Sequence, residues 1–342
     1  MKVINASYQL INEPSITKKI ERIARVCYKS EDKIGEGTDL KMINNLIKRS
    51  HFAMLEHASI VLKVSFDVYS YLQSIVATIE NDVIKLKAHG LAPVKSYLRF
   101  SFDTNKNNEK VYYVSGNVRA WFEFFAITSQ MNLLDKQVFD CINKISSNLF
   151  KKMSCKESLL TECIIEQVTN FDTMSNESRL LHEDISILFT VDRGVANELV
   201  RHRDCSFAQE STRYVNYSLD RFGNEITVIE PCFWINENEK DIILHDYWVN
   251  ACENTEAMYF QLLKYGATPQ QARDVLAIST KTDIVATTNL REWRHIFNLR
   301  ACDSTGPAHP QIKEVMIPCL KELKPIYDFA FNDLVTADEV MK

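Results

Sequence analysis

Glycine is scarce in this chain, and that scarcity strongly constrains the folds open to it. Only 8 of the 342 residues are glycine, and neither a GxGxxG nor a GxxxxGK[ST] pattern occurs. Those glycines form the tight turns that cradle phosphates in Rossmann domains and in P-loop proteins. The sequence therefore supports neither fold, and any nucleotide bound by this chain must have its phosphates held by other groups.

Length and composition are those of a large globular protein. The 342 residues suggest one large domain or two smaller ones, and such a chain buries about three quarters of its extended surface. The 46% of hydrophobic and 25% of charged residues exclude collagen-like, disordered and coiled-coil chains. The formal net charge of −5 provides no basic footprint for nucleic acid or for a membrane surface, so neither is expected as a partner.

The nine cysteines indicate a reducing compartment rather than a disulfide scaffold. Their number is odd and no two form a CxxC pair, so we expect free thiols and no metal site. The first residues contain no apolar run of signal-peptide length, and no window approaches the ~18 apolar residues of a membrane span. We therefore expect a cytoplasmic protein that does not span a membrane.

Apolar periodicity along the chain predicts an α+β fold, with one mixed or antiparallel sheet flanked by helices. Runs rich in β-branched residues predict strands at 2–9, 58–67, 185–191, 226–230 and 282–288. Apolar residues at helical spacing predict helices at 15–29, 38–50, 193–203, 239–265, 269–276, 290–301 and 310–335. The residues between 203 and 211 are expected to form a polar loop.

The stretch from 68 to 184 differs from the rest because it carries no recognisable chemistry. It is predicted to be mostly helical, with helices near 68–88, 117–130, 135–152 and 157–168. An Asn- and Lys-rich run at 103–110 predicts an exposed loop between them. We interpret 68–184 as an insertion of unknown role into a discontinuous domain formed by 1–67 and 185–342.

The densest polar cluster is the run RHRDCSFAQESTRY, which extends from Arg201 to Tyr214. Arg201 and Arg203 stand two residues apart near a predicted helix end, so their side chains point to different sides. The ordinary interpretation of such a cluster is a solvated basic turn. Acidic partners for that turn are available nearby, at Asp192, Glu198 and Asp204. The fixed spacing from Arg201 to Ser211 favours a binding motif instead.

This run resembles the signature of the flavin-dependent thymidylate synthases (the ThyX family), in which Arg-His-Arg is followed after seven residues by Ser-x-Arg-Tyr. Four further segments resemble that family and occur in the expected order. They are HFAMLEHASIVLKV at 51–64, ATPQQARDVL at 267–276, NLREWRHIFNLR at 289–300 and AHPQI at 308–312. The resemblance covers about 1–67 and 185–340.

The resemblance implies a reaction, a set of cofactors and an assembly. The implied reaction is the reductive methylation of deoxyuridine monophosphate (dUMP) to dTMP, with methylene-tetrahydrofolate as carbon donor, FAD as hydride carrier and NADPH as reductant. A dianionic phosphate and a uracil carbonyl that gains negative charge both suit arginine, which stays protonated and binds oxyanions through two N–H groups. The resemblance also implies a homotetramer whose active sites form between subunits.

Site residues are implied position by position. Flavin contacts are implied for His51, Arg201, His202, Arg203, Gln209, Asn289, Arg291 and His295. Nucleotide contacts are implied for Glu198, Arg201, Gln209, Glu210, Ser211, Arg213, Arg273 and Arg300. Arg300 matches the arginine that polarises the uracil and favours its ionised form, and we expect it to be catalytic. Ser211 is not expected to act as a covalent nucleophile.

The chain departs from the family pattern at three positions. Glu198 stands where many members have Gln, Ala277 replaces a Pro, and Ala53 replaces a Ser or Thr. Because a carboxylate would repel a phosphate, we expect Glu198 to face an arginine instead. Loss of the Pro is expected to loosen a turn without changing the chemistry.

Three other functions stay open at this point. A member of the same family could act on another pyrimidine nucleotide, or could transfer a hydroxymethyl group. A homologue could bind flavin or nucleotide without catalysis, although four arginines and one serine of the motifs are all retained, which argues against it. A nucleic-acid-binding module is opposed by the net charge and by the lack of a basic stripe.

Overall fold

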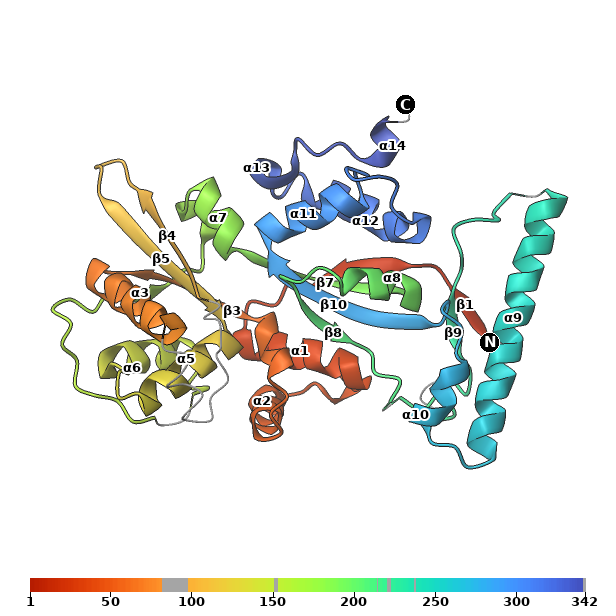
Figure 1. Cartoon of the computed structure of the whole chain (residues 1–342), viewed down its shortest axis with the longest axis horizontal. Helices are drawn as coiled ribbons and strands as arrows, with labels where there is room; N and C mark the ends of the chain where they lie inside the picture. The colour runs from red at the N-terminus through yellow and green to blue at the C-terminus, as the bar shows by residue number, and fades with distance from the viewer. Residues whose placement is uncertain (82–97, 151–152, 214, 220–222, 237, 341–342) are drawn as a thin grey trace. The chain divides into compact units, whose positions relative to one another are not determined.

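The computed structural model describes residues 1–81, 98–150, 153–213, 215–219, 223–236 and 238–340 (Figure 1). The chain divides into two compact units, which are described one by one. The first unit consists of Met1–Asn12, Arg22–Ile34 and Ile185–Lys342, and the second of Glu13–Glu21 and Gly35–Asp184.

A four-stranded sheet forms the centre of the first unit. Its strands, in spatial order, are β2 (Ser7–Leu10), β7 (Asp184–Asp192), β10 (Lys281–Asn289) and β8 (Ser206–Gln209). β2 is antiparallel to β7, and β8 is antiparallel to β10. Two side-chain hydrogen bonds link β7 to β10, one between Ser186 and Thr287 and one from Thr190 to Asp283. Because the residue numbers rise along β7 while those of their partners fall along β10, the two strands are antiparallel. The predicted α+β class with an antiparallel sheet is therefore confirmed for this unit.

Each of the two central strands is followed directly by a helix whose first turn is capped by the last residue of the strand. Asp192 ends β7, and its side chain accepts a hydrogen bond from a backbone N–H of α8 (Arg193–Leu199). Asn289 ends β10 and caps α11 (Leu290–Arg300) in the same way. A side-chain oxygen at this position satisfies an N–H that has no partner within its own helix. These two junctions position the segments that carry the predicted motifs.

The other elements of the first unit surround this sheet (Figure 1). A parallel pair joins β1 (Lys2–Ile4) to β9 (Thr227–Ile229). The remaining helices are η1 (Glu31–Lys33), α10 (Pro269–Ala272), η5 (Arg273–Val275), α12 (Pro310–Leu323), α13 (Asp328–Phe331) and α14 (Ala337–Val340). α12 packs against α11 and β2. α1 (Ile16–Tyr28) has residues in both units.

The longest helix is α9 (Glu239–Lys264), which ends just before Gly266 at a positive φ of 92°. This position, where only glycine is unstrained, is where the sequence predicts the helix to stop. Although α9 has 26 residues, none of the helices in the described part of the chain is sufficiently long and apolar to cross a membrane.

The second unit is built on an antiparallel sheet of its own. Its strands, in spatial order, are β4 (Arg99–Thr104), β5 (Lys110–Asn117), β3 (Ser59–Val64) and β6 (Ile165–Gln167). Its helices are α2 (Thr38–Lys48), η2 (Phe52–His57), α3 (Phe66–Asn81), α5 (Val118–Gln130), α6 (Lys136–Ile145), η3 (Phe171–Thr173) and α7 (Asn176–His182). Trp121, Phe125 and Phe139 pack together in its core, with ring centroids 5.1 to 5.8 Å apart.

The prediction that 68–184 is mostly helical is wrong in part. Helices are present near three of the four predicted positions (residues 82–88 lie outside the described residues), but the fourth, at 157–168, contains β6. The run at 103–110 is indeed exposed, but it joins β4 to β5 in a hairpin. The sequence did not predict this sheet, because its strand β3 pairs with β5 and β6, which lie far away in the sequence. For the same reason, the long segment of the second unit that ends at Asp184 begins at Gly35 rather than at residue 68, and Glu13–Glu21 belongs to that unit as well.

Candidate active site

The signature run leaves α8 in a turn and then joins the sheet. Arg201 and Arg203 lie in this turn with exposed side chains, whereas His202 between them is 7% exposed. The following residues form β8, which pairs with β10, although the sequence predicts only a polar loop here. Exposed and buried residues therefore alternate in this turn, with one exposed arginine before the buried imidazole and one after it.

Arg300, the last residue of α11, connects the signature to α8. Its Nη1 donates to Oε2 of Glu198 at 2.9 Å, and its Nε donates to Nε2 of His202 at 3.3 Å. The expectation that Glu198 faces an arginine is therefore confirmed. The Arg300 and Glu198 side chains are only 21% and 26% exposed, so the ion pair is shielded from water and stronger than a surface pair.

His202 is held in its neutral form. Burial, and secondarily the neighbouring Arg300 and His295, lower the pKa of His202 to about 4. Because Nε2 accepts a hydrogen bond from Arg300, we assign the remaining ring proton to Nδ1. The imidazole therefore carries no charge at neutral pH and offers one N–H.

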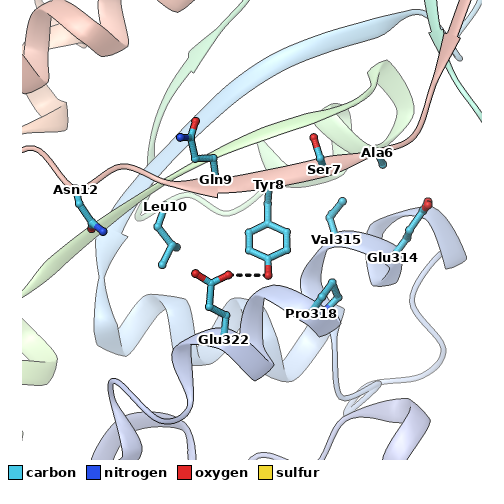
Figure 2. Close-up of a pocket in the computed structure, with 10 residues that line it drawn as sticks. All are labelled: Ala6, Ser7, Tyr8, Gln9, Leu10, Asn12, Glu314, Val315, Pro318 and Glu322. Carbon is cyan, nitrogen blue, oxygen red and sulfur yellow. Dashed lines mark hydrogen bonds between the residues drawn. The ribbon is translucent and has the colours of Figure 1, made fainter.

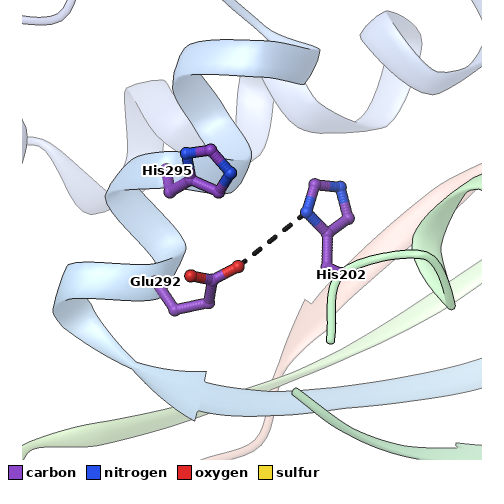
Figure 3. Close-up of side chains that lie close together, drawn as sticks. All are labelled: His202, Glu292 and His295. Atoms are coloured by element: carbon purple, nitrogen blue, oxygen red, sulfur yellow. Dashed lines mark ion pairs between the residues drawn. The ribbon is translucent and has the colours of Figure 1, made fainter. Parts of the chain in front are cut away.

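Glu292 and His295 complete the cluster from the first turns of α11 (Figure 3). Glu292 Oε1 lies 3.9 Å from Nδ1 of His202, and the two imidazole rings are 6.2 Å apart and nearly perpendicular. Burial raises the pKa of Glu292. The ligand atoms of all three side chains lie within 4.8 Å of one another, close enough to share a metal ion, but the adjacent guanidinium groups oppose a cation. The expected absence of a metal remains a prediction.

These side chains line a cavity of about 340 Å³. Its wall is made of Arg201, His202, Arg203, Asp204, Glu292, His295, Leu299 and Arg300. Within the described part of the chain, Arg201 and Arg203 form no ion pair. Beside the carboxyl groups of Asp204 and Glu292, the wall offers N–H donors from three guanidinium groups and two imidazoles. Guanidinium groups that form no ion pair suit an anionic ligand such as a phosphate. Sequence reasoning missed Glu292, Asp204 and Leu299, although the spacing of Glu292 and His295 on one helix face was a usable signal.

Several residues implied as contacts do not line this cavity. Arg213, in the turn after β8, and Arg273, in η5, have exposed side chains elsewhere in the unit, and Arg291 is exposed on α11. The Asn289 side chain caps α11, and the Ser211 N–H donates to the carbonyl of Cys27. His51 belongs to the second unit, where it precedes η2 with an exposed side chain.

Gln209 and Glu210 are bound within the fold. Gln209 donates from Nε2 to Thr282 Oγ1 at 3.2 Å. Glu210 is 4% exposed, and its carboxylate lies 2.9 Å from Lys281 Nζ and 3.6 Å from Lys29 Nζ. Both lysines also pair with Asp283. This buried ionic network therefore contains two cations and two anions. No motif or spacing in the sequence predicts it.

The cations of this network set the pKa of Asp283. Burial alone would raise that pKa, but Lys281 and Lys29 outweigh burial and hold it below its usual value. The Asp283 carboxylate is therefore charged at neutral pH and matched by its neighbours. The network has the composition of a structural element, since each charged group already has an opposite charge beside it.

Comparisons with known proteins relate these motifs to characterised relatives. Residues 146–327 match the family described as "Thymidylate synthase complementing protein", a range that begins within the segment predicted as an insertion. The flavin-dependent thymidylate synthase of Pyrococcus abyssi is 32% identical over 182 residues, which cover 48% of this chain and 70% of that protein. The enzyme of the same name from Mycobacterium tuberculosis is 32% identical over 172 residues, which cover 46% and 64%.

A solved structure is similar to this chain over most of its length. It is the UMP/dUMP methylase PolB from Streptomyces cacaoi, bound with 5-Br UMP, with a TM-score of 0.41 and 13% identity over 98% of this chain and 97% of that one. The sequence match to the family covers more than half of the chain and includes the signature run and α11. The chain belongs to the flavin-dependent thymidylate synthase family.

Proposed function

We propose that this protein is a flavin-dependent thymidylate synthase that methylates dUMP to dTMP, with methylene-tetrahydrofolate as carbon donor and NADPH as reductant. The observation that carries the proposal is the arrangement at the cavity. Arg300 contacts both Glu198 and a neutral His202. On the same wall lie two arginines that form no ion pair with any residue that the structure describes. Family membership supplies the class of reaction for which such a site is suited.

FAD is the flavin that we propose for this site, and when bound it supplies the hydride. Arg201 and Arg203 bind its anionic groups, and His202 and His295 line the wall beside it. His51, Gln209, Asn289 and Arg291 are further proposed flavin contacts, on the strength of their motif positions alone. A permanently charged guanidinium is suited to a flavin whose negative charge rises on reduction.

Arg300 is the proposed catalytic residue. A guanidinium on the uracil carbonyl stabilises the negative charge that the ring gains as carbon 5 becomes nucleophilic. Glu198 orients Arg300 through the 2.9 Å ion pair, and His202 receives its Nε–H without competing as a cation. Glu198 and His202 thus fix the position of the Arg300 guanidinium, and the neutral imidazole adds no positive charge that would repel it.

Arg213, Ser211 and Arg273 are proposed to bind the nucleotide phosphate in an active site formed between subunits. None of the three lines the cavity of the single chain, which favours a site completed by another copy. α9 supports association, because Ile243, Tyr247, Met258, Leu262 and Tyr265 are all exposed along it and just beyond its end. Such an apolar stripe is typical of an interface. We propose a homotetramer, which sedimentation of the purified protein would test.

The proposed function is tested in an anaerobic assay. The protein is loaded with FAD and is given NADPH, methylene-tetrahydrofolate and a panel of pyrimidine nucleotides. Methyl transfer that depends on FAD and is strongest on dUMP would support the proposal. Transfer to another pyrimidine nucleotide, or of a hydroxymethyl group, would identify a family member with altered specificity. Bound flavin with no transfer to any nucleotide would indicate a non-catalytic homologue.

A further inference from the structure

A cavity lies away from the Arg300 cluster, between β2 and α12 in the first unit (Figure 2). It has a volume of about 550 Å³, within the range of known ligand sites. Five consecutive residues, from Ala6 to Leu10, line one side, and Glu314, Val315, Pro318 and Glu322 line the other. We call this cavity the β2–α12 groove.

The strand side of the groove is the open edge of the sheet. β2 is the outermost strand, next to β7. The Ile11 N–H donates to the Ser186 carbonyl at 2.9 Å, so the residues two and four positions before Ile11 also bond to β7. The N–H and C=O groups of Tyr8 and Leu10 therefore point away from β7. Within the described residues, no backbone partner is present for them, and such an edge can accept a further strand.

The helix side of the groove is acidic. Tyr8 donates its hydroxyl proton to Glu322 Oε2 at 2.8 Å, and Oε2 of Glu314 is buried with no hydrogen-bond partner. Burial raises the pKa of Glu314. No lysine, arginine or histidine lines this groove in the described part of the chain. A positively charged side chain beside each carboxylate would supply it with a charge-assisted hydrogen bond.

The strand edge and the carboxylates together define one occupant. We propose that the β2–α12 groove binds an extended peptide segment that adds a strand to β2 and carries two basic side chains toward α12. Glu314 and Glu322 are eight residues apart on α12, or about 12 Å. An extended chain covers that distance in about four residues, and an even spacing keeps both side chains on one face. The expected pattern is therefore Lys or Arg at positions i and i+4.

The same charges argue against a symmetric pairing of β2 with β2 of a second copy. That arrangement would bring two acidic grooves together without a cation between them, which costs free energy. The partner is therefore a basic extended segment rather than the same edge of another copy. This proposal is independent of the flavin chemistry, since the groove contains none of the residues assigned to the active site.

The probe for this groove is the fluorescently labelled peptide acetyl-Val-Lys-Val-Thr-Val-Lys-Val-amide, and the measurement is fluorescence anisotropy with the full chain. We expect saturable binding. A matched peptide with Glu in place of both Lys should not bind. Methylation of backbone nitrogens at one alternate set of positions should abolish binding, whereas methylation of the other set should have little effect, because only alternate residues face a paired strand.

Variants of the protein test the acidic side. The double variant E314Q/E322Q should weaken binding of the Lys peptide about tenfold, whereas E253Q, an exposed position on α9, should leave it unchanged. Thermal unfolding midpoints of the variants confirm that they fold. The proposal would be overturned if the peptide did not bind, if neither set of backbone methylations weakened binding, or if spermidine competed as well as the peptide. The last result would identify a site for small cations.

Discussion

The ionic network around Glu210 and the cluster around Arg300 lie in the same unit and use the same kinds of side chain, yet they differ in burial and in how many of their cations form ion pairs. In the network, two lysines face two carboxylates, and Glu210 is nearly inaccessible. In the cluster, Arg300 pairs with Glu198, and the cavity wall adds two exposed arginines, a neutral imidazole and the carboxyl groups of Asp204 and Glu292.

This difference separates a structural role from a binding role. In a buried network whose charges are all paired, a charged ligand finds no group without a partner, and removal of one member strongly destabilises the fold. In the cluster, the two exposed arginines of the cavity wall form no ion pair with any residue that the structure describes, so their guanidinium groups can bind an anion.

The variant R300A should lower kcat about 10²- to 10³-fold, because it removes the cation proposed to stabilise the charged uracil. The flavin absorbance of the loaded protein should remain. Steady-state methyl transfer is the measurement. R294A is the matched control, since Arg294 lies on the same helix but pairs with Asp333 and should retain turnover. Near-normal turnover in R300A would remove Arg300 from the chemistry.

The variant E210A should destabilise the fold by about 3 kcal/mol, because Lys29 and Lys281 would share only one carboxylate in a buried site. Urea unfolding provides the free energy. The control is E166A, whose exposed pair with Lys63 should contribute less than about 1 kcal/mol. If both variants lost the same small amount, the network would not be the structural element described here.

Protonation of His202 should make stability depend on pH. The unfolded chain has an ordinary histidine pKa of about 6.5, and the folded value is about 4. Between these values the unfolded state binds more protons, so this contribution to stability is present above pH 6.5 and is lost as the pH falls toward 4. H202N should lose less stability between pH 7 and pH 5 in urea unfolding. An equal loss in both proteins would show that His202 is not held neutral.

The variant E198Q should have the smallest effect. It restores the residue found in many family members and releases Arg300 from its ion pair, so dUMP should bind about threefold more tightly, a change worth less than 1 kcal/mol. Calorimetric titration of dUMP measures it, with E239Q on α9 as the control. Markedly weaker binding would show that Glu198 itself supports the nucleotide.

The fold of the first unit could largely be predicted, because local signals mark its elements. Asp192 and Asn289 start helices at the ends of buried strands, and Gly266 follows the end of α9. The sheet of the second unit could not be predicted in the same way. β6 has three residues, and its partner β3 lies about a hundred positions earlier in the chain, so no local periodicity reports the pairing.

The candidate site could be predicted only as far as its motifs reach. Arg201, His202, Arg203, His295 and Arg300 meet at one cavity, and the spacing of the motifs points to all five. The burial of Glu210 in an ionic network could not be foreseen, because Lys29, Lys281 and Asp283 come from separate segments and match no pattern. Contacts proposed for Arg213 and Arg273 would depend on a second copy, which one sequence does not describe.

The central claim is that the Arg300 cluster performs methyl transfer to a uracil nucleotide. The most direct test is the mass of the nucleotide recovered after anaerobic incubation of the wild-type protein and of R300A with FAD, NADPH, methylene-tetrahydrofolate and dUMP. We expect a gain of one methyl group with the wild type and none in the same time with R300A. An unchanged dUMP mass with the flavin-loaded wild type, or equal methylation by both proteins, would contradict it.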